Sequence, residues 1–308
     1  MGKPMTFFCL CMSPALDATV YLPRAPKGDG EIFKCVREDV FPGGKAVNVA
    51  RWLARRGEKV AVGGLLGEDN AAPFERELSA CGIADRFVRV AGETRRNEMI
   101  TWPGGSVKIN RPAFPRLVGG AWDAVLSKVD WLPAGVAIVS GSLPPAVPCD
   151  FYAKAASHFR SSGWKVVVDA SGEAMKLALE AGTDLVKPNA EECEALVGFV
   201  PKAPEEFLRA TRLLREKAAH VVISDGGSGA WFDGTFVAAP EVDVVDTTAA
   251  GDTLLAEFCW RVWGGGQAEC GGMAEAAEWA VAAGSASCTM PGGSPPDIEF
   301  VNRLKGRK

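Results

Sequence analysis

The stretch WKVVVDASGEAMKLALEAGTDLVKPN, residues 164–189, contains two short apolar runs separated by a longer amphipathic segment. The two runs are continuously apolar rather than alternating, which is typical of parallel strands that are buried on both faces. The segment at 172–181 carries its apolar residues at helical spacing. The stretch therefore predicts a strand, a helix and a second strand, which is the repeating unit of parallel sheets.

The same alternation continues through most of the 308 residues. Further strand candidates are TFFCLCM (6–12), KVAVGGLLG (59–67), GVAIVSG (135–141) and AHVVISDGG (219–227), and helix candidates lie at 46–56, 74–81, 151–161 and 204–218. We therefore predict an α/β fold, a three-layer α/β/α sandwich with a mostly parallel sheet. Ligands of such folds bind at the carboxyl ends of the strands.

Two segments break this pattern, at about 18–40 and 91–112, and both contain short β-prone pieces. A hairpin is expected around PGG (103–105), and another in GAWFDGTFVAAP (229–240) with its turn at Asp233-Gly234. The two irregular segments are expected to form a small β lid on a single domain that spans 1–308.

Composition excludes several classes of function. The net charge of −4 and the lack of a basic stripe argue against a nucleic-acid partner. No apolar run approaches the roughly 20 residues that a membrane span needs. The nine cysteines are scattered without a CxxC pair, which favours reduced thiols in the cytoplasm, and two histidines are too few for a histidine-based metal site.

The stretch VVDTTAAGDTLLAEFCW (244–260) places three small residues and one acid where a strand passes into a helix. The backbone amides of Ala249, Ala250, Gly251 and Asp252 would form an anion hole at the helix N-terminus. Asp252 could then accept the proton of an attacking hydroxyl. The structural alternative is a helix capped by a threonine at 247 or 248, with Asp252 serving only the helix dipole.

The stretch FPGGKAVNVARWLARRG (41–57) opens on Gly43 and Gly44 and continues as a helix. Two glycines before a helix allow close approach of a ligand, and free amides there bind anions. Lys45 adds a positive charge and Asn48 lies one turn further on. An ordinary turn with a solvated lysine is the alternative.

Three further stretches carry polar candidates. SPALD directly follows the first strand and is expected to place Asp17 at the carboxyl end of that strand, where an acid could bind sugar hydroxyls or simply stabilise a turn. TRRN offers Arg95 and Asn97 on one face of a strand, either for a phosphate or for solvent. VKPNAEE holds Asn189 and Glu192 three apart, a spacing that by itself favours a helix cap and that also fits the binding of Mg²⁺ and nucleotide phosphates.

Eight motifs in order, SPALD, PGGKAVNVA, GGLLGEDN, ETRRN, SGSLPPAV, VDASGEA, VKPNAEE and VVDTTAAGDT, resemble the ribokinase-like (PfkB) family of sugar kinases. The likeness covers nearly the whole chain. It is greatest to the phosphosugar branch, which comprises 1-phosphofructokinases, minor 6-phosphofructokinases and tagatose-6-phosphate kinases. The resemblance implies a ribokinase-like sandwich with a β lid, ATP and Mg²⁺ as cofactors, and a homodimer formed through the lid.

The resemblance also implies a role for each matching residue. Asp252 would be the catalytic base, with Ala249, Ala250 and Gly251 as the anion hole. The sugar and its phosphate would be held by Asp17, Gly43, Gly44, Lys45, Asn48, Arg95 and Asn97. ATP would be bound by Lys187, Asn189, Ser224, Gly226, Gly227 and Gly229, and Glu192 would hold Mg²⁺ through water.

The sequence departs from the family pattern at several positions. Ala249 replaces the usual first glycine of the anion hole, Asp225 replaces an apolar residue beside the nucleotide, and Ala46 replaces a glycine. The leading prediction is an ATP-dependent kinase of a phosphorylated ketohexose: fructose 1-phosphate, fructose 6-phosphate or tagatose 6-phosphate. The alternatives are a family kinase of an unphosphorylated sugar or nucleoside, and a catalytically impaired sensor of sugar phosphates or nucleotides.

Overall fold

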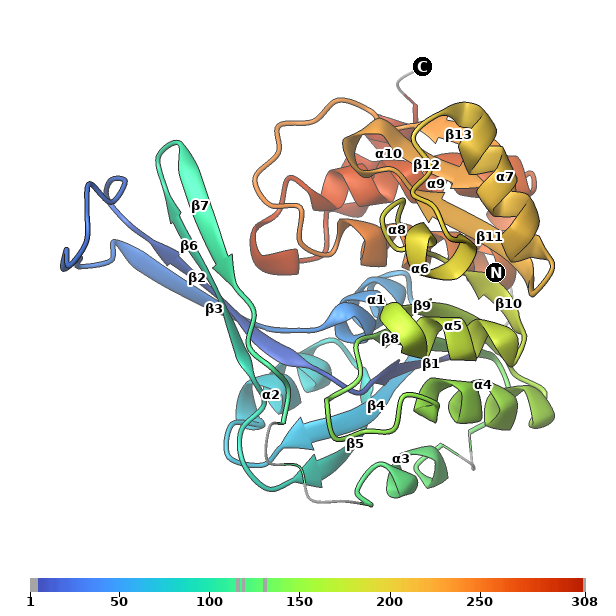
Figure 1. The fold of residues 1–308 in the computed structure, drawn as a ribbon, viewed down its shortest axis with the longest axis horizontal. Coiled ribbons are helices and arrows are strands. Elements are labelled where there is room, and N and C mark those ends of the chain that lie inside the picture. Colours follow the sequence, from blue (N-terminus) through green and yellow to red (C-terminus); the bar gives the residue numbers. More distant parts are fainter. Residues whose placement is uncertain (1–4, 115–116, 118–119, 130–131, 307–308) are drawn as a thin grey trace.

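The computed structural model describes residues 5–114, 117, 120–129 and 132–306. Its main sheet has nine strands in the order β13-β12-β11-β10-β9-β8-β1-β4-β5 (Figure 1). The pairs from β11 to β5 are parallel, and the β11–β12 and β12–β13 pairs are antiparallel. The strands are β1 (Thr6–Cys11), β4 (Lys59–Gly67), β5 (Ala84–Val90), β8 (Val136–Gly141), β9 (Lys165–Ala170), β10 (Thr183–Val186), β11 (Ala218–Ser224), β12 (Gly229–Phe232) and β13 (Thr235–Ala238).

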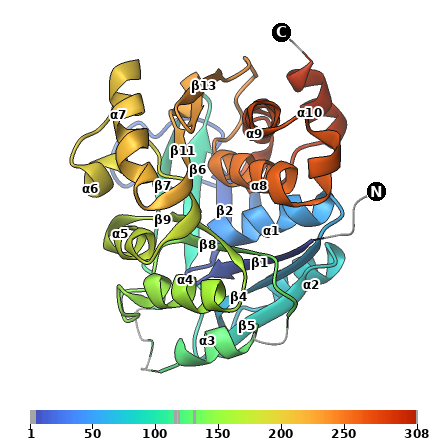
Figure 2. The same ribbon diagram turned by 90° about the vertical axis from the view of Figure 1, so that its right-hand side faces the viewer.

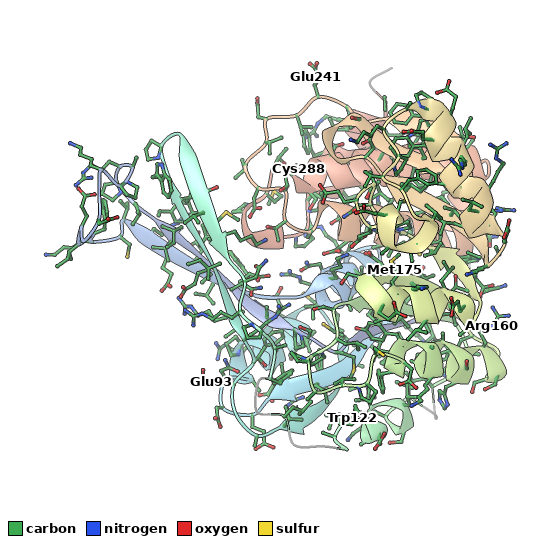
Figure 3. All side chains as sticks on the ribbon, viewed as in Figure 1. Glu93, Trp122, Arg160, Met175, Glu241 and Cys288 are labelled. Atoms are coloured by element: carbon green, nitrogen blue, oxygen red, sulfur yellow. The ribbon has the colours of Figure 1, made fainter. Side chains whose placement is uncertain are left out.

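Helices cover both faces of this sheet, as the two views of the ribbon show (Figures 1 and 2). One layer contains α1 (Lys45–Arg55), α2 (Ala72–Ala80), α8 (Ala250–Trp263), α9 (Met273–Ser287) and α10 (Ile298–Lys305). The other contains α3 (Asp123–Ser127), α4 (Phe151–Ser161), α5 (Gly172–Glu180), α6 (Cys193–Val197) and α7 (Pro204–Arg215). Side chains fill the space between the layers (Figure 3).

The position of β1 inside the sheet, with strands on both sides, explains why its sequence is apolar throughout. Phe7 and Cys9 belong to the core beneath α1 and α8, whereas Phe8 and Leu10 belong to the core beneath α4. All four side chains are fully buried. Because successive side chains of a strand point to opposite faces, a strand covered on both sides must be apolar at every position.

A second sheet of four strands, in the order β3-β2-β6-β7, projects from the body (Figure 1). It consists of β2 (Ala15–Tyr21), β3 (Arg37–Gly43), β6 (Arg96–Trp102) and β7 (Gly105–Ile109). The turn between β6 and β7 is at Pro103-Gly104, where Gly104 has a φ of 90° that favours glycine. We call this sheet the lid.

The predicted fold class, sandwich plus lid, is confirmed, and the strands and helices expected from periodicity are present within a few residues. The hairpin of β12 and β13 turns at Asp233 and Gly234, which both have positive φ. The strand β5 was not predicted, because it forms the edge of the sheet and its sequence ADRFVRV mixes charged with apolar residues. Among the described helices, none is long and apolar enough to cross a membrane.

Candidate active site

A cavity of about 530 Å³ opens where the lid meets the carboxyl ends of the central strands. Four basic side chains (Lys45, Arg95, Lys108 and Lys187) and three acidic ones (Asp17, Glu192 and Asp252) line it. Eight uncharged residues that the sequence predicted also line it: Gly44, Asn48, Asn97, Asn189, Ser224, Ala249, Ala250 and Gly251. The position agrees with the rule that ligands of open α/β sheets bind at this edge.

The N-terminus of α8 faces this cavity through the small residues of the TTAAGD motif. Ala249 is the residue before the helix and has φ 64° and ψ 6°, in the left-handed region. No side-chain hydrogen bond caps α8, so the structural alternative of a threonine cap is not found at this described helix end. The amides of Gly251 and Asp252 lie in the first turn, where a helix offers no intrahelical acceptor. They can therefore bind an anion.

Asp252 is buried, with an exposed fraction of 6%. Its Oδ2 accepts a hydrogen bond of 2.8 Å from Nδ2 of Asn48. Burial raises the pKa of Asp252 to about 6, aided by the charge of Asp169 and opposed by Lys45 and the Asn48 amide. A carboxyl with such a pKa is largely ionised at neutral pH and can still accept and return a proton.

Asp169, which the sequence reasoning missed, lies beneath the cavity at the end of β9. Its Oδ1 is 3.0 Å from Nζ of Lys45 and 3.3 Å from Nζ of Lys187. Although burial raises its pKa, Lys187 and Lys45 hold the pKa of Asp169 below its ordinary value. The pKa of Lys45 is correspondingly raised, chiefly by Asp169. The result is a fixed pair of ammonium groups beside the N-terminus of α8, since Lys187 Nζ lies 3.4 Å from where a Cβ on Gly251 would be.

Asn189 and Glu192 form the reciprocal cap that their spacing allows. The Asn189 N–H donates to Oε2 of Glu192 at 2.9 Å, and the Glu192 N–H donates to Oδ1 of Asn189 at 2.7 Å. Oε1 of Glu192 lies 3.8 Å from Nζ of Lys45, on the cavity side. No group of three or more metal-binding side chains occurs among the described residues. A single carboxylate such as that of Glu192 suits Mg²⁺, which usually retains waters and binds substrate phosphates.

Asp17 does not follow the first strand directly, because β1 ends at Cys11 and Asp17 lies within β2 of the lid. Its Oδ1 accepts a hydrogen bond of 2.9 Å from Nδ2 of Asn97. Burial raises the pKa of Asp17, and the Asn97 hydrogen bond opposes this effect. Gly43 is needed for this contact, since a Cβ there would lie 2.0 Å from Oδ2 of Asp17.

Arg95 joins the lid to the end of β1. Its guanidinium donates to the carbonyls of Ser13 at 3.2 Å, Pro14 at 3.4 Å and Arg111 at 3.1 Å. Arg95 and Asn97 line the cavity, as their shared strand face predicts, whereas Arg96 pairs with Glu38 on the lid. Much of the hydrogen-bonding capacity of Arg95 is therefore used within the protein.

Several residues that line the cavity were not predicted from the sequence. Lys108 and Asn110 come from β7 and the segment after it, and Ser13 and Ser142 come from the ends of β1 and β8. The sequence SVKIN alternates polar and apolar residues, which indicates that Lys108 lies on the opposite face of its strand from Val107 and Ile109. The two apolar side chains are exposed. Of the glycine-rich turn, Ser224 lines the cavity and Gly226, Gly227 and Gly229 do not.

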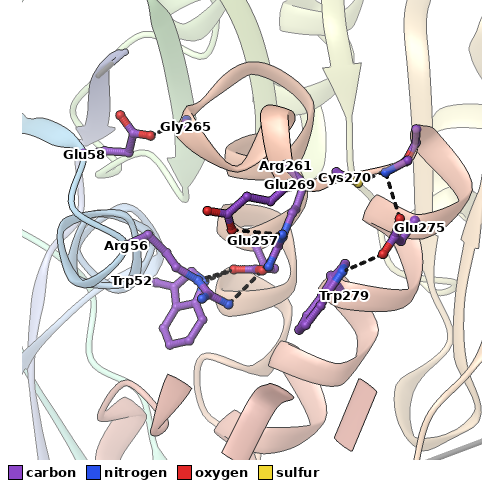
Figure 4. Close-up of polar contacts among 12 residues, drawn as sticks. Trp52, Arg56, Glu58, Glu257, Arg261, Gly265, Glu269, Cys270, Glu275 and Trp279 are labelled. Carbon is purple, nitrogen blue, oxygen red and sulfur yellow. Dashed lines mark hydrogen bonds and ion pairs between the residues drawn. The ribbon is translucent and has the colours of Figure 1, made fainter. Parts of the chain in front are cut away.

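The helices α1 and α8, which carry Asn48 and Asp252, are joined by a buried ionic cluster (Figure 4). Glu257 of α8 is fully buried and accepts two hydrogen bonds of 2.8 Å from Arg56, just after α1. It also accepts from Trp52 Nε1 at 2.8 Å and from Arg261 Nε at 3.0 Å. This cluster fixes the two helices relative to each other on the side away from the cavity.

Comparisons with known proteins show which family the sequence resembles. The model of the "pfkB family carbohydrate kinase" family matches residues 12–299. The 1-phosphofructokinase of Escherichia coli K12 is 35% identical over 254 residues, 80% of each chain. That of Haemophilus influenzae is 36% identical over 235 residues, 74% of this chain and 75% of the relative.

Solved structures give the same result. Phosphofructokinase-2 of Escherichia coli, in complex with substrates and products, superposes with a TM-score of 0.88 at 26% identity over 99% of each chain. The ribokinase of Arabidopsis thaliana, with ribose and ATP, has a TM-score of 0.74 at 22% identity over the full length of both chains, which is a likeness of fold. The family resemblance of the sequence is thereby confirmed, and the chain belongs to the pfkB family of carbohydrate kinases.

Proposed function

We propose that this protein transfers the γ-phosphoryl group of ATP to a primary hydroxyl of a phosphorylated ketohexose, with Asp252 as general base. The observation that carries the proposal is the buried carboxylate of Asp252 in the first turn of α8, beside free amides and two lysines. Phosphoryl transfer requires mainly positioning and charge neutralisation, and this arrangement supplies both.

Asp252 accepts the proton of the acceptor hydroxyl as its oxygen bonds to the γ-phosphorus and the bond from that phosphorus to the ADP oxygen breaks. The amides of Gly251 and Asp252 stabilise the charge on the transferring group. We assign Lys45 and Lys187 to the same group, because Asp169 holds both beside α8.

ATP is the proposed donor. Asn189 and Ser224, joined by a β-bridge, would border its phosphates at the cavity edge. A second, largely apolar cavity of about 700 Å³ lies along β13 against α9 and shares no lining residue with the first, so we assign it no part of ATP. Glu192 would hold Mg²⁺ through water, and the ion would neutralise phosphate charge when bound.

The proposed acceptor is a sugar phosphate, because Arg95 and Lys108 bring two positive charges to the lid side of the cavity, where Asp17 and Asn97 could bind hydroxyls. Fructose 1-phosphate is the first candidate, since the relatives of about 35% identity are named 1-phosphofructokinases. A cytoplasmic location remains a prediction.

We further propose that the lid mediates a homodimer. Its strands and tip expose Val36, Val40, Val107 and Ile109, with exposed fractions from 39% to 71%. Apolar side chains on a projecting sheet are typical of an interface. Light scattering of the wild type and of a Val40→Glu, Ile109→Glu variant would decide: a wild-type monomer, or an unchanged dimer in the variant, contradicts this assembly.

The test of the activity is ADP release from Mg·ATP over a panel of acceptors. The panel contains fructose 1-phosphate, fructose 6-phosphate, tagatose 6-phosphate, fructose, ribose and adenosine, with Asp252→Asn as control. We expect turnover on one phosphoketohexose, at least about 100-fold lower in the variant. Isothermal titration with ATP should give similar affinities for both proteins.

Other results would contradict the proposal in distinct ways. Turnover on an unphosphorylated acceptor alone would identify a family kinase of another substrate class. Thermal stabilisation by ATP or a sugar phosphate without any turnover would identify a sensor, which the strained Ala249 would help to explain. Full activity of Asp252→Asn would remove Asp252 as the base.

A further inference from the structure

Arg51 is a buried cation close to the site that does not line the cavity. Its side chain is 2% exposed, and it lies on α1 one turn after Asn48. Its Nη2 donates to Oδ1 of Asn48 at 2.6 Å and to the carbonyl of Gly293 at 3.2 Å. Placing a guanidinium at so enclosed a position is costly unless its partners are well arranged.

The hydrogen bonds of Asn48 have a single consistent direction. A guanidinium only donates and an ionised carboxylate only accepts. The amide oxygen of Asn48 must therefore face Arg51, and the amide nitrogen must face Asp252, as the distances of 2.6 Å and 2.8 Å show. Arg51 thus holds Asn48 in a rotamer in which its N–H points at Oδ2 of Asp252, leaving Oδ1 of the base for the acceptor.

The same guanidinium reaches the loop beside the anion hole. Gly293 has φ 69°, and a Cβ on it would lie 3.3 Å from Cβ of Ala249. Nη1 of Arg51 pairs with Oε1 of Glu77 on α2 at 3.5 Å. Arg51 therefore links α1, α2 and the 291–293 turn around the base and the residue that precedes α8.

We propose that Arg51 is a positioning residue that orients the base Asp252 through Asn48 and keeps it ionised. This inference rests on the proposed function, because it assumes that Asp252 accepts the proton. The groups facing Asp252 are Lys45 and Asn48 of α1, Asp169 of β9 and Lys187 after β10. Of these contacts, the Asn48 amide is the one that Arg51 sets directly.

The test compares Arg51→Met, Arg51→Lys and Asn48→Ala with a control, Arg55→Met. Arg55 is on the same helix, its side chain is 43% exposed, and its paired carboxylate of Asp297 is 3.8 Å away. We expect Arg51→Met to lower kcat about 10- to 100-fold with little change in KM for ATP, because one or two charged hydrogen bonds around the base are lost. Arg51→Lys should recover part of the loss, and Arg55→Met should match the wild type.

The decisive readout does not depend on turnover. The ¹³C resonance of the Asp252 carboxyl, assigned by its absence in Asp252→Asn, is titrated in each variant without substrates. We expect its pKa to rise by about 0.5 or more in both variants. Asn48→Ala removes the amide that donates to the carboxylate, and Arg51→Met leaves that amide free to turn away from it. Adding Arg51→Met to Asn48→Ala should lower kcat little further.

The outcomes separate the two proposals. An unchanged Asp252 pKa in a folded Arg51→Met, or fully additive losses of kcat with Asn48→Ala, would overturn the role of Arg51 and leave the kinase intact. If Arg51→Met does not fold, Arg51→Lys and Asn48→Ala give the same comparison. If the wild type phosphorylates no acceptor, the proposed function fails while the titration still reports whether Arg51 controls Asp252.

Discussion

At the scale of single residues, Ala249 shows how one backbone angle constrains the site. An L-residue in the left-handed region pays roughly 1–2 kcal/mol, and Ala249 has φ 64° at the start of α8. The geometry of the loop therefore requires a conformation that glycine would adopt without strain. The alanine at this position therefore carries a cost in the free energy of folding.

We expect Ala249→Gly to stabilise the protein by about 0.5 kcal/mol, because relief of the strain exceeds the entropy that glycine adds to the unfolded chain. Chemical denaturation measures the change. The matched control is Ala250→Gly, the first residue of α8, which should destabilise by about 0.5–1 kcal/mol. If both substitutions destabilise equally, Ala249 is not strained.

The pKa of Asp252, about 6, predicts a pH dependence. A base must be ionised to accept a proton, so kcat/KM should fall about tenfold for each pH unit below about 6. Sugar phosphates also titrate near pH 6. The control is therefore Asn48→Ala, which should move the acid limb upward without altering the substrate. If the acid limb of kcat/KM lies at the same pH in Asn48→Ala as in the wild type, the limb reports the substrate phosphate and not Asp252.

At the scale of elements, the site depends on how α1 and α8 are held together. Glu257 is fully buried between Arg56 and Arg261, whose side chains are 6% and 4% exposed (Figure 4). The guanidinium groups also stack on the rings of Trp52, Trp260 and Trp279. Such a cluster confers a defined geometry, and its charges are costly when one partner is missing.

We expect Glu257→Ala to lower the free energy of unfolding by about 3–5 kcal/mol, because two buried arginines lose their carboxylate. Guanidinium denaturation followed by tryptophan fluorescence measures it. Glu269→Ala is the control: Glu269 also pairs with Arg261, at 3.8 Å, but its side chain is 70% exposed, so the change should stay within about 0.5 kcal/mol. If both substitutions lowered the free energy of unfolding equally, burial would not be what makes the Glu257 ion pairs important for stability.

At the scale of the whole molecule, the cavity exists because two sheets meet. The main sheet provides Lys187 and Ser224 near its strand ends, and the lid provides Asp17, Asn97 and Lys108. Residues of both sheets therefore line the cavity. Because we propose that the acceptor binds on the lid side of the cavity, lid residues should affect the affinity for the acceptor more than that for ATP.

We expect Lys108→Ala to raise KM for the sugar phosphate roughly 10- to 100-fold, because a hydrogen bond to a charged phosphate contributes about 1.5–3 kcal/mol. The KM for ATP should change less than about twofold. Lys34→Ala is the control, since Lys34 is an exposed lid lysine outside the cavity. If KM for the acceptor is unchanged in Lys108→Ala, the phosphate does not bind at the lid.

The sequence by itself determined the sandwich, the lid, the α8 motif and most of the residues that line the cavity. Continuous apolar strands and amphipathic helices are local patterns, and glycines or small residues beside charges are visible in one chain. The order of motifs then indicated the family, which the comparisons confirmed.

The tertiary structure alone decided which distant residues touch. Asp169 reads as the polar end of an apolar strand, and its pairing with Lys45 joins residues 124 apart in the chain. Arg51 reads as one basic residue of ARWLARRG, yet it is buried whereas Arg55 is exposed. Burial and long-range pairing depend on how whole layers pack, and this determines the pKa of Asp252 and the direction in which Asn48 donates.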